Sequence, residues 1–229
     1  MTRDANPHQT GDGFGHWMQD RTGKLTGSRM DGAMSFLKQK YDKDGKPLPK
    51  EDASERRKLK IEILAERLTG NIVPKYVTQE MQWGIDHEPM AKQAFQEYMG
   101  EGYEITDLGF IDHPTIENCG VSPDGFIAAK GALIEIKCPS TGTMLNWQLA
   151  AANAFWLPEE YIPQMVLQSA CMGGIPVWFC AYDPRLPERV RLIVRKFTPT
   201  AEQIAEVEQA AKVFLEEVDD MFDQLTMEA

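Results

Sequence analysis

Apolar residues in the first hundred positions recur with the spacing of helices. They return every three or four residues in most of the stretch from Ser28 to Gly100, which a Gly- and Pro-rich run over 42–50 interrupts. The period predicts amphipathic helices and the interruption predicts a loop. We expect helices over 28–41, 52–70 and 78–100, with Ser28 capping the first and Thr78 capping the last.

After Gly100 the apolar runs shorten and are separated by turn residues, which predicts strands. Strands are expected over 103–105, 108–111, 125–129, 132–137, 176–182 and 190–197, with a two-residue turn at Lys130-Gly131. Helices are expected over 143–155, 163–171 and 200–226. This order predicts an α/β (α+β) fold with a mixed central β-sheet flanked by helices. We expect a single domain over 1–229 whose first 16 residues are flexible.

Charge is divided unevenly along the chain. The net charge is −11, yet residues 1–60 carry 13 Lys and Arg against 9 Asp and Glu, whereas the predicted C-terminal helix is acidic. A basic first quarter can line a channel for phosphates, and an acidic helix is usually a solvated face. Composition permits a DNA channel as well as an ordinary solvated surface and selects neither.

Cysteine and histidine do not indicate a zinc site or a disulfide framework. The four Cys form no pair at two-residue spacing and the four His do not cluster with them, so we expect buried thiols in a reducing compartment. No signal peptide is predicted, and no apolar run approaches the ~18 residues that a membrane span needs. The expected location is the cytoplasm.

Three charged residues are expected on one face of the predicted hairpin. Glu135 and Lys137 are two residues apart on a strand and share a face, and the two-residue turn makes Asp124 a diagonal neighbour of Glu135, ~7–8 Å away. Clustered carboxylates repel unless a cation intervenes, and Mg²⁺ prefers carboxylate oxygens. With a lysine to orient or deprotonate a water, they predict metal-assisted attack on phosphorus. A cross-strand salt bridge to Lys137 on an exposed face explains the pattern equally well.

A further carboxylate, Glu88, falls on the apolar stripe of the helix predicted over 78–100. The stripe consists of Met81, Ile85, Ala91, Phe95 and Tyr98. A lone carboxylate among apolar residues is costly and needs a partner. That partner is a metal or, as the alternative, an Arg or Lys from another element.

These residues resemble the motif of the PD-(D/E)xK nuclease superfamily, in which Pro123-Asp124 is followed by Glu135-Ile136-Lys137. The wider pattern is similar to the phage lambda exonuclease family, also called YqaJ-type viral recombinases. Its five blocks are Trp17, Arg21, Gly23, Thr26 and Ser28; Trp83-Gly84 with Glu88; Ser122-Pro123-Asp124-Gly125; Glu135-Ile136-Lys137-Cys138-Pro139; and Gln164 with Tyr182-Asp183-Pro184-Arg185. The family often has a second Gln two residues after the first, where this chain has Val166 and the next Gln is at 168.

The resemblance implies a restriction-endonuclease-like fold with a two-metal site. Asp124, Glu135 and the Ile136 carbonyl hold one Mg²⁺ in this scheme, and Glu88 helps Asp124 to hold a second. Lys137 positions and activates the attacking water. Two Mg²⁺ ions are the implied cofactor, with Mn²⁺ as an alternative metal.

The resemblance also implies that Arg21, Ser28 and Gln164 bind a 5′-terminal phosphate. Ser28 and Gln164 are expected at helix starts, which favour phosphate, and an arginine can grip a phosphate with two hydrogen bonds. Taken singly, each has an ordinary explanation: an N-cap for Ser28, a surface ion pair for Arg21 and a polar first-turn residue for Gln164.

Two apolar residues near Glu88 are open to two interpretations. Met81 lies where the family places an apolar wedge that separates the DNA strands, and the slightly favoured alternative is a core methionine beside Ile85. Trp83 is expected to pack against its neighbours rather than to stack on a base.

The implied activity is that of a Mg²⁺-dependent deoxyribonuclease that degrades double-stranded DNA from 5′-phosphate ends. It releases mononucleotides 5′ to 3′ and leaves a 3′ single strand for phage-type recombination in the cytoplasm of a bacterial host. A homotrimeric ring and a single-strand annealing protein are the implied assembly and partner. An endonuclease or repair nuclease of the same superfamily needs only Asp124, Glu135 and Lys137. A catalytically inactive DNA-binding module is the third alternative, which the presence of Lys137 disfavours.

Overall fold

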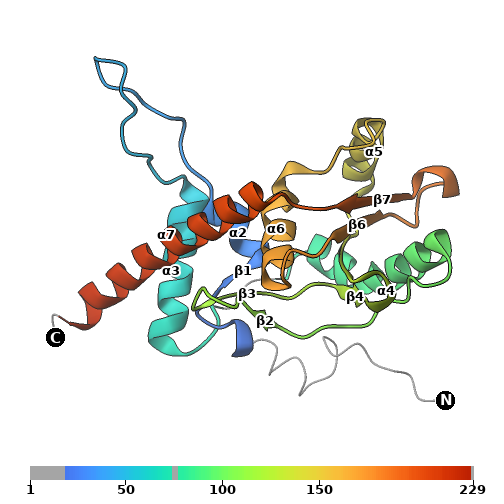
Figure 1. The fold of residues 1–229 in the computed structure, drawn as a ribbon, viewed down its shortest axis with the longest axis horizontal. Helices are drawn as coiled ribbons and strands as arrows, with labels where there is room; N and C mark the ends of the chain where they lie inside the picture. Colours follow the sequence, from blue (N-terminus) through green and yellow to red (C-terminus); the bar gives the residue numbers. More distant parts are fainter. Residues whose placement is uncertain (1–18, 74–76, 228–229) are drawn as a thin grey trace.

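The computed structural model describes residues 19–73 and 77–227 (Figure 1). Trp17 and the start that was predicted to be flexible lie outside these residues. The strands are β1 (Leu25–Thr26), β2 (Ile111–Asp112), β3 (Cys119–Val121), β4 (Gly125–Ile127), β5 (Ala132–Lys137), β6 (Val177–Tyr182) and β7 (Leu192–Phe197). The α-helices are α2 (Met30–Ala33), α3 (Ser54–Thr69), α4 (Gln79–Met99), α5 (Thr141–Ala150), α6 (Ile162–Cys171) and α7 (Ala201–Thr226), with 3₁₀ turns η1 (Gly27–Arg29), η2 (Ala128–Lys130), η3 (Glu159–Tyr161) and η4 (Glu188–Val190). The predicted mixed α/β fold is confirmed.

The larger sheet has the strand order β4-β5-β6-β7 and is mixed, because only β5 and β6 run parallel. Alternation along β5 sends Ile134 and Ile136 to one face, where they pack against Phe95 of α4. Leu133 faces the other side and packs with Met165 of α6 and residues of α5. Helices therefore cover both faces of this sheet, as the sequence predicted.

The hairpin between β4 and β5 differs from the predicted one. Ile127 pairs with Ala132, and the connection is the 3₁₀ turn η2 followed by Gly131 in the left-handed region, at φ 55°. The two-residue turn at Lys130-Gly131 was therefore wrong, and the register is shifted by two residues. Because side chains alternate with a period of two, the shift leaves every residue on its predicted face.

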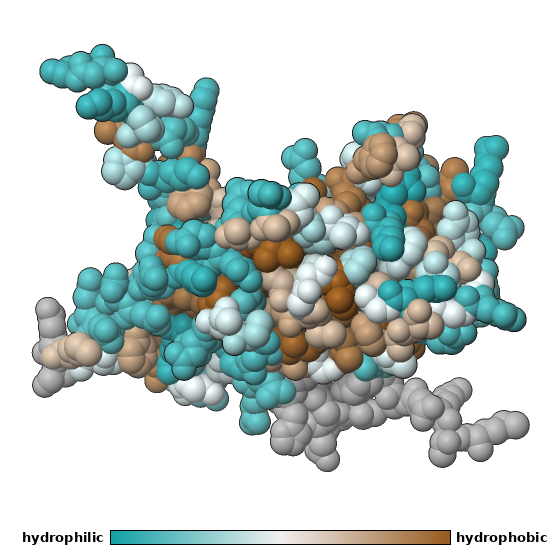
Figure 2. Space-filling view, viewed as in Figure 1, coloured by the Kyte–Doolittle hydropathy of each residue, from teal (hydrophilic) through white to brown (hydrophobic). Residues whose placement is uncertain are grey.

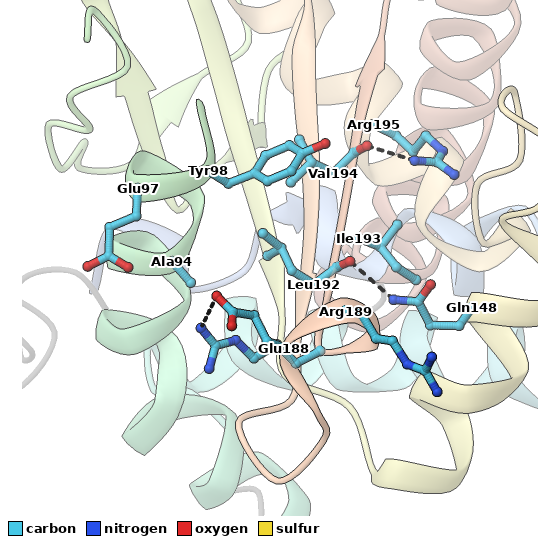
Figure 3. Close-up of a pocket in the computed structure, with 11 residues that line it drawn as sticks. Ala94, Glu97, Tyr98, Gln148, Glu188, Arg189, Leu192, Ile193, Val194 and Arg195 are labelled. Atoms are coloured by element: carbon cyan, nitrogen blue, oxygen red, sulfur yellow. Dashed lines mark hydrogen bonds and ion pairs between the residues drawn. The ribbon is translucent and has the colours of Figure 1, made fainter. Parts of the chain in front are cut away.

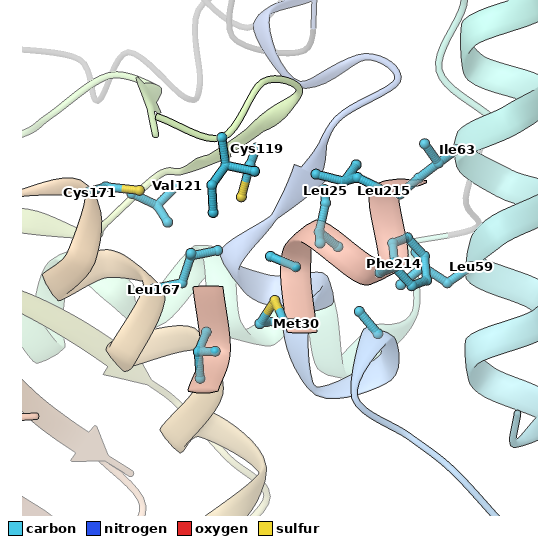
Figure 4. Packing of buried hydrophobic residues seen from close by; sticks show 14 of the residues in the cluster. Leu25, Met30, Leu59, Ile63, Cys119, Val121, Leu167, Cys171, Phe214 and Leu215 are labelled. Atoms are coloured by element: carbon cyan, nitrogen blue, oxygen red, sulfur yellow. The ribbon is translucent and has the colours of Figure 1, made fainter. Parts of the chain in front are cut away.

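A second, three-stranded sheet has the order β1-β3-β2 and lies beside a helical core. Figure 4 shows this core, where Leu25 and Met30 from the N-terminal segment meet Leu167 of α6 and Phe214 of α7. The sequence did not predict β1 or β3. The expected strand over 103–105 is instead a single bridge from Thr106 to Phe126, and the one over 108–111 shrinks to β2.

The helix predicted over 28–41 ends at Ala33. Beyond it the chain forms a projecting arm over residues 37–52, which Figures 1 and 2 show standing off the body with a largely hydrophilic surface. Leu37 N donates to Glu51 O at 2.8 Å and Leu48 N donates to Lys40 O at 2.9 Å, so backbone pairing with its own return segment replaces the helix. The arm holds five lysines and few apolar residues, which leaves no stripe for a helix to bury.

The acidic helix α7 is confirmed over its predicted length and packs along α3 and α6. Its Glu217 binds Arg56 at 2.9 Å and Lys60 at 2.6 Å, and its Asp219 binds Arg67. Part of the basic first quarter is thus neutralised inside the molecule and is not available to line a DNA channel. Within the described ranges, no helix combines the length and apolarity needed to cross a membrane.

Candidate active site

The hairpin positions the predicted catalytic residues. One step beyond the pair of Gly125 with Ile134, its register places Asp124 across from Glu135. Asp124 N donates to Ile134 O at 3.2 Å, and Asp124 Oδ2 accepts a hydrogen bond from Ile136 N at 2.6 Å. These contacts fix the carboxylate beside the end of β5, where Glu135 and Lys137 share a face.

Glu135 is 1% exposed and receives hydrogen bonds on both carboxylate oxygens. Oε1 accepts from Lys137 Nζ and from Gln164 Nε2, the latter at 2.7 Å, and Oε2 accepts from Gln168 Nε2 at 2.5 Å. The Lys137 ammonium also lies 4.7 Å from the ring centroid of Tyr161, a cation–π distance. The salt bridge of the alternative interpretation is present between Glu135 and Lys137, but it lies within β5 and is largely buried, not across strands on an exposed face.

The electrostatics of this cluster favour a bound cation. Burial raises the pKa of Asp124 well above its usual value, and the charges of Glu135 and Glu88 raise it further, against Lys137 and the Ile136 amide. Burial works against the charge of Lys137, but Glu135 and Asp124 outweigh it and raise the lysine pKa. Carboxylate repulsion of this kind is relieved by a divalent cation.

Glu88 faces the same region from α4 but also has a lysine partner. Lys92 Nζ lies 3.0 Å from Glu88 Oε1 and 2.6 Å from Asp107 Oδ1. Of the predicted apolar stripe, Ala91 and Phe95 are buried, whereas Met81, Ile85 and Tyr98 are 50%, 45% and 70% exposed and were wrongly included. Glu88 therefore has an ion-pair partner, but Lys92 belongs to the same helix and not to another element as the alternative interpretation expected.

A cavity of about 440 Å³ joins Glu88 to the hairpin residues. Asp124, Ile136 and Lys137 line one side, and Glu80, Met81, Gly84, Ile85, Cys138, Pro139 and Tyr161 complete it. Met81 is 50% exposed and borders this cavity, so the favoured interpretation as a core methionine was wrong. Its role as a wedge stays a prediction.

The oxygen ligands around this cavity suit a hard divalent cation. As the side chains lie, no three carboxylate, imidazole or thiol groups of the described residues form a ready-made metal cluster. Each predicted ligand instead has another partner: Glu135 the glutamines and Lys137, Asp124 the Ile136 amide, and Glu88 the ammonium of Lys92. Buried repulsion at Asp124 and the oxygen-rich donor set fit Mg²⁺ or Mn²⁺.

Beside the carboxylates, Arg21 gathers hydroxyl groups. Its Nη1 donates to Ser122 Oγ at 3.0 Å, and its Nη2 donates to Ser28 Oγ at 3.2 Å and Thr26 Oγ1 at 3.3 Å. Burial, followed by the charge of Arg29, lowers the pKa of Arg21 to about 10. The guanidinium stays charged at neutral pH, so this Arg21 cluster is suited to an anion.

Two predictions about this cluster need correction. Ser28 lies within the 3₁₀ turn η1 and is not the N-cap of a helix. Gln164 is in the first turn of α6, as predicted, but its amide binds Glu135. A Cβ on Gly27 would lie 3.5 Å from Gln164 Cγ, so the Gln164 stem passes beside the Arg21 cluster and links it to the carboxylates.

Sequence reasoning assigned no site role to Ser122 or Gln168. Ser122 stands two residues before Asp124, and that spacing was an available signal because side chains two apart on an extended chain share a side. Gln168 follows Gln164 by four residues, the spacing of one helix face. Neither signal predicts which neighbour the side chain meets.

Asp183 and Arg185 form an ion pair beside Pro139, which lines the cavity. Asp183 is fully buried and binds Arg185 Nε at 2.7 Å, while Arg185 Nη2 donates to Pro139 O at 3.2 Å. The guanidinium lies 4.0 Å from the ring centroid of Trp83, whose ring also stacks on His87 at 3.5 Å. The Trp83 ring thus contacts both a guanidinium and an imidazole of this chain, which supports packing rather than base stacking.

A different hollow of about 420 Å³ lies between α4, α5 and β7 (Figure 3). Gln148 from α5 donates to Leu192 O there at 3.1 Å, and Arg195 binds the Val194 carbonyl at 2.9 Å. None of the predicted site residues lines it. These side chains cap edge carbonyls of β7, a structural task.

Residues 16–174 match the family model of the YqaJ-like viral recombinase domain. The chain belongs to this family. The match spans the Arg21 cluster, the hairpin and Gln168, and it ends before Arg185. No curated protein matches the chain.

The solved structures of two exonucleases are similar to that of this YqaJ-family chain. An alkaline exonuclease from Laribacter hongkongensis, LHK-Exo, is 31% identical, with a TM-score of 0.77 over 93% of this chain and 97% of that one. Its complex with dAMP gives the same values. A phage-related exonuclease from Haemophilus somnus 129PT, at 15% identity and TM-score 0.64, covers 89% of this chain and 96% of its own and shares the fold.

Proposed function

We propose that this chain is a metal-dependent exonuclease that degrades double-stranded DNA from 5′-phosphate ends. It proceeds 5′ to 3′, releases 5′-mononucleotides and leaves a 3′ single strand. The observation that carries the proposal is the contiguity of two clusters. The buried acid–lysine cluster around Glu135 and the Arg21 cluster are joined by Gln164 and by Ser122, two residues before Asp124.

The residues divide the work between chemistry and end recognition. Asp124, Glu135, Glu88 and the Ile136 carbonyl would hold the divalent metal, which would supply Lewis acidity and lower the pKa of a water. Lys137, held between Glu135 and the Tyr161 ring, orients that water towards the phosphorus. The Tyr161 face and the buried position of Glu135 keep the lysine in place and exclude bulk solvent.

Recognition of the 5′ end falls to the Arg21 cluster. A terminal phosphate offers several acceptor oxygens, and the Arg21 fork with the Ser28 hydroxyl supplies matching donors. Occupation of this cluster sets the distance of the first scissile bond from the end. Met81, exposed at the cavity edge, is placed to separate the terminal base pair.

At the level of assembly we propose a homotrimeric ring and a single-strand annealing protein as partner. The family membership and the exonuclease relatives support a role in phage-type recombination. An endonuclease of the same superfamily is less well supported, because an internal cut gives the Arg21 cluster no terminal phosphate to bind.

The test is nucleotide release in Mg²⁺ from three duplexes: linear with 5′-phosphate, linear with 5′-hydroxyl and closed circular. We expect rapid release from the first alone, and a fall in kcat of at least about 100-fold in Lys137→Ala. Lys130→Ala, in the exposed turn of the same hairpin, is the matched control and retains activity. Cleavage of circles contradicts an end-specific enzyme, and release from no substrate in Mg²⁺ or Mn²⁺ leaves a binding module.

A further inference from the structure

Helix α6 presents two buried glutamines to one carboxylate. Gln164 and Gln168 are four residues apart and lie on the same face of the helix. They are 9% and 1% exposed, and their amide nitrogens donate to different oxygens of Glu135, at 2.7 and 2.5 Å. Together they hold the carboxylate from both oxygens.

The chemistry of Glu135 fixes which way the Gln168 amide points. An ionised carboxylate only accepts hydrogen bonds, so the amide must present its nitrogen. Gln168 Oε1 is buried without a hydrogen-bond partner in the described part of the chain, and so nothing there favours the flipped amide. Leaving that oxygen unsatisfied is costly, and the hydrogen bond from the Gln168 nitrogen to Glu135 is the favourable contact that offsets it.

The two glutamines have different surroundings. Gln164 passes beside Gly27 and so borders the Arg21 cluster. Gln168 lies one turn further along α6 and does not line the cavity. Val166, between them, is 1% exposed and packs in the helical core with Leu25 and Phe214. In this chain a glutamine at 166 therefore faces away from Glu135, whereas one at 168 reaches it.

We propose that Gln168 is a positioning residue that holds Glu135 Oε2 and thereby keeps the carboxylate in the orientation that binds the divalent cation. The proposal rests on the metal site of the proposed function. Gln168 touches no reacting atom; it acts through Glu135. Outer-sphere partners of this kind commonly change metal affinity or activity by about 10–100-fold.

The experiment measures metal binding without DNA. Free Mn²⁺ is followed by electron paramagnetic resonance in titrations of the wild type, Gln168→Met and Gln148→Met. Methionine keeps the length of the side chain and removes its donor. Gln148, whose amide caps Val190 O and Leu192 O, is a matched control because it carries the same substitution far from the site.

We expect the Mn²⁺ Kd to rise about tenfold in Gln168→Met and to stay unchanged in Gln148→Met. In nuclease assays Gln168→Met should keep its KM for DNA ends, with a kcat that is low at wild-type metal levels and recovers at higher Mn²⁺. A purely structural role predicts neither the affinity change nor that recovery.

An unchanged Mn²⁺ Kd in folded Gln168→Met overturns the proposal, whatever its activity. Cooperative unfolding in EDTA shows whether Gln168→Met is folded. If it is not, Gln168→Asn takes its place, because it keeps the amide but withdraws it by one methylene. Gln168→Asn must then show the weaker Mn²⁺ binding. A wild type that binds Mn²⁺ without releasing nucleotides refutes the proposed function alone, since the affinity difference still decides the role of Gln168. A wild type that binds no Mn²⁺ overturns the positioning role.

Discussion

At the scale of single residues, the geometry of donors matters more than their charge. Arg21 directs two guanidinium nitrogens at three hydroxyl groups from two segments, those of Thr26 and Ser28 in one and that of Ser122 in the other. A lysine carries the same charge on a single nitrogen and cannot reproduce this fork. The arrangement is therefore suited to an anion with several oxygens, as the proposed function requires.

Substituting Arg21→Lys tests that specificity. We expect KM for 5′-phosphorylated duplex ends to rise about tenfold, and the preference for 5′-phosphate over 5′-hydroxyl to shrink accordingly, because one of two parallel hydrogen bonds is lost. Initial rates on the two substrates measure it. Arg57→Lys, which alters an exposed arginine whose side chain donates to the Asp52 carbonyl, serves as the control. An unchanged preference would remove Arg21 from end recognition.

The common face of Glu135 and Lys137 was predictable because it depends only on strand alternation. The predicted register was wrong by two residues, which left this common face unchanged. The correct register places Asp124 directly opposite Glu135, where a diagonal position was predicted. The partner of Gln164 was not predictable, since it depends on how α6 docks against β5. The role of Gln168 was not predictable for the same reason. Its spacing from Gln164 shows which face of the helix it lies on, but only the packing of α6 determines which residue that face contacts.

At the scale of elements, α3 and α7 are joined by charge across an otherwise apolar contact. Arg56 is 1% exposed, binds Glu217 and Asp52, and lies 4.6 Å and 5.0 Å from the rings of Phe36 and Phe214. Removing an acidic partner of a buried guanidinium leaves its charge uncompensated, which destabilises the fold. The acidic helix thus has a structural task in addition to its solvated face.

Glu217→Ala should lower the free energy of unfolding by about 1–2 kcal/mol. The value is below that for a fully buried pair because Glu217 is partly exposed and Asp52 remains. Urea unfolding measures it, with Glu216→Ala on the exposed side of α7 as the matched control. Equal stability of the two variants would mean that the ion pair contributes nothing.

The long helices were predictable and the short elements were not. In α3, α4 and α7 a helical period runs over many residues, and in α4 Thr78 Oγ1 accepts from Met81 N as an N-cap should. Strands of two or three residues, such as β1 and β3, contain no period to read. Their pairing is set by distant segments, as when β1 aligns with β3.

At the scale of the whole molecule, stability should depend on a neutral histidine. His113 is 6% exposed, and its Nδ1 accepts from Thr115 N at 3.2 Å and Ile116 N at 3.1 Å. Burial lowers the pKa of His113, while Glu208 opposes the shift and Lys212 adds to it. Protonation at Nδ1 would also break both backbone hydrogen bonds.

Because the folded protein binds this proton less tightly than the unfolded chain, stability is undiminished above the unfolded pKa of about 6.5. It should fall as the pH drops below that value towards the folded pKa. In His113→Asn the side-chain oxygen can accept the same bonds without titrating. Urea unfolding at pH 7.5 and 5.5 should therefore show a smaller acid loss in the variant, and equal losses would contradict the assignment.

The two ends of the arm over 37–52 converge at its base, where Phe36 pairs with Asp52 and Asp52 binds Arg56 and Lys60 of α3. Closing a longer loop at a fixed base costs little, about 0.6 kcal/mol for each doubling of length. The tip is therefore a permissive insertion point: a peptide epitope or fluorescent tag placed after Gly45 leaves the base undisturbed.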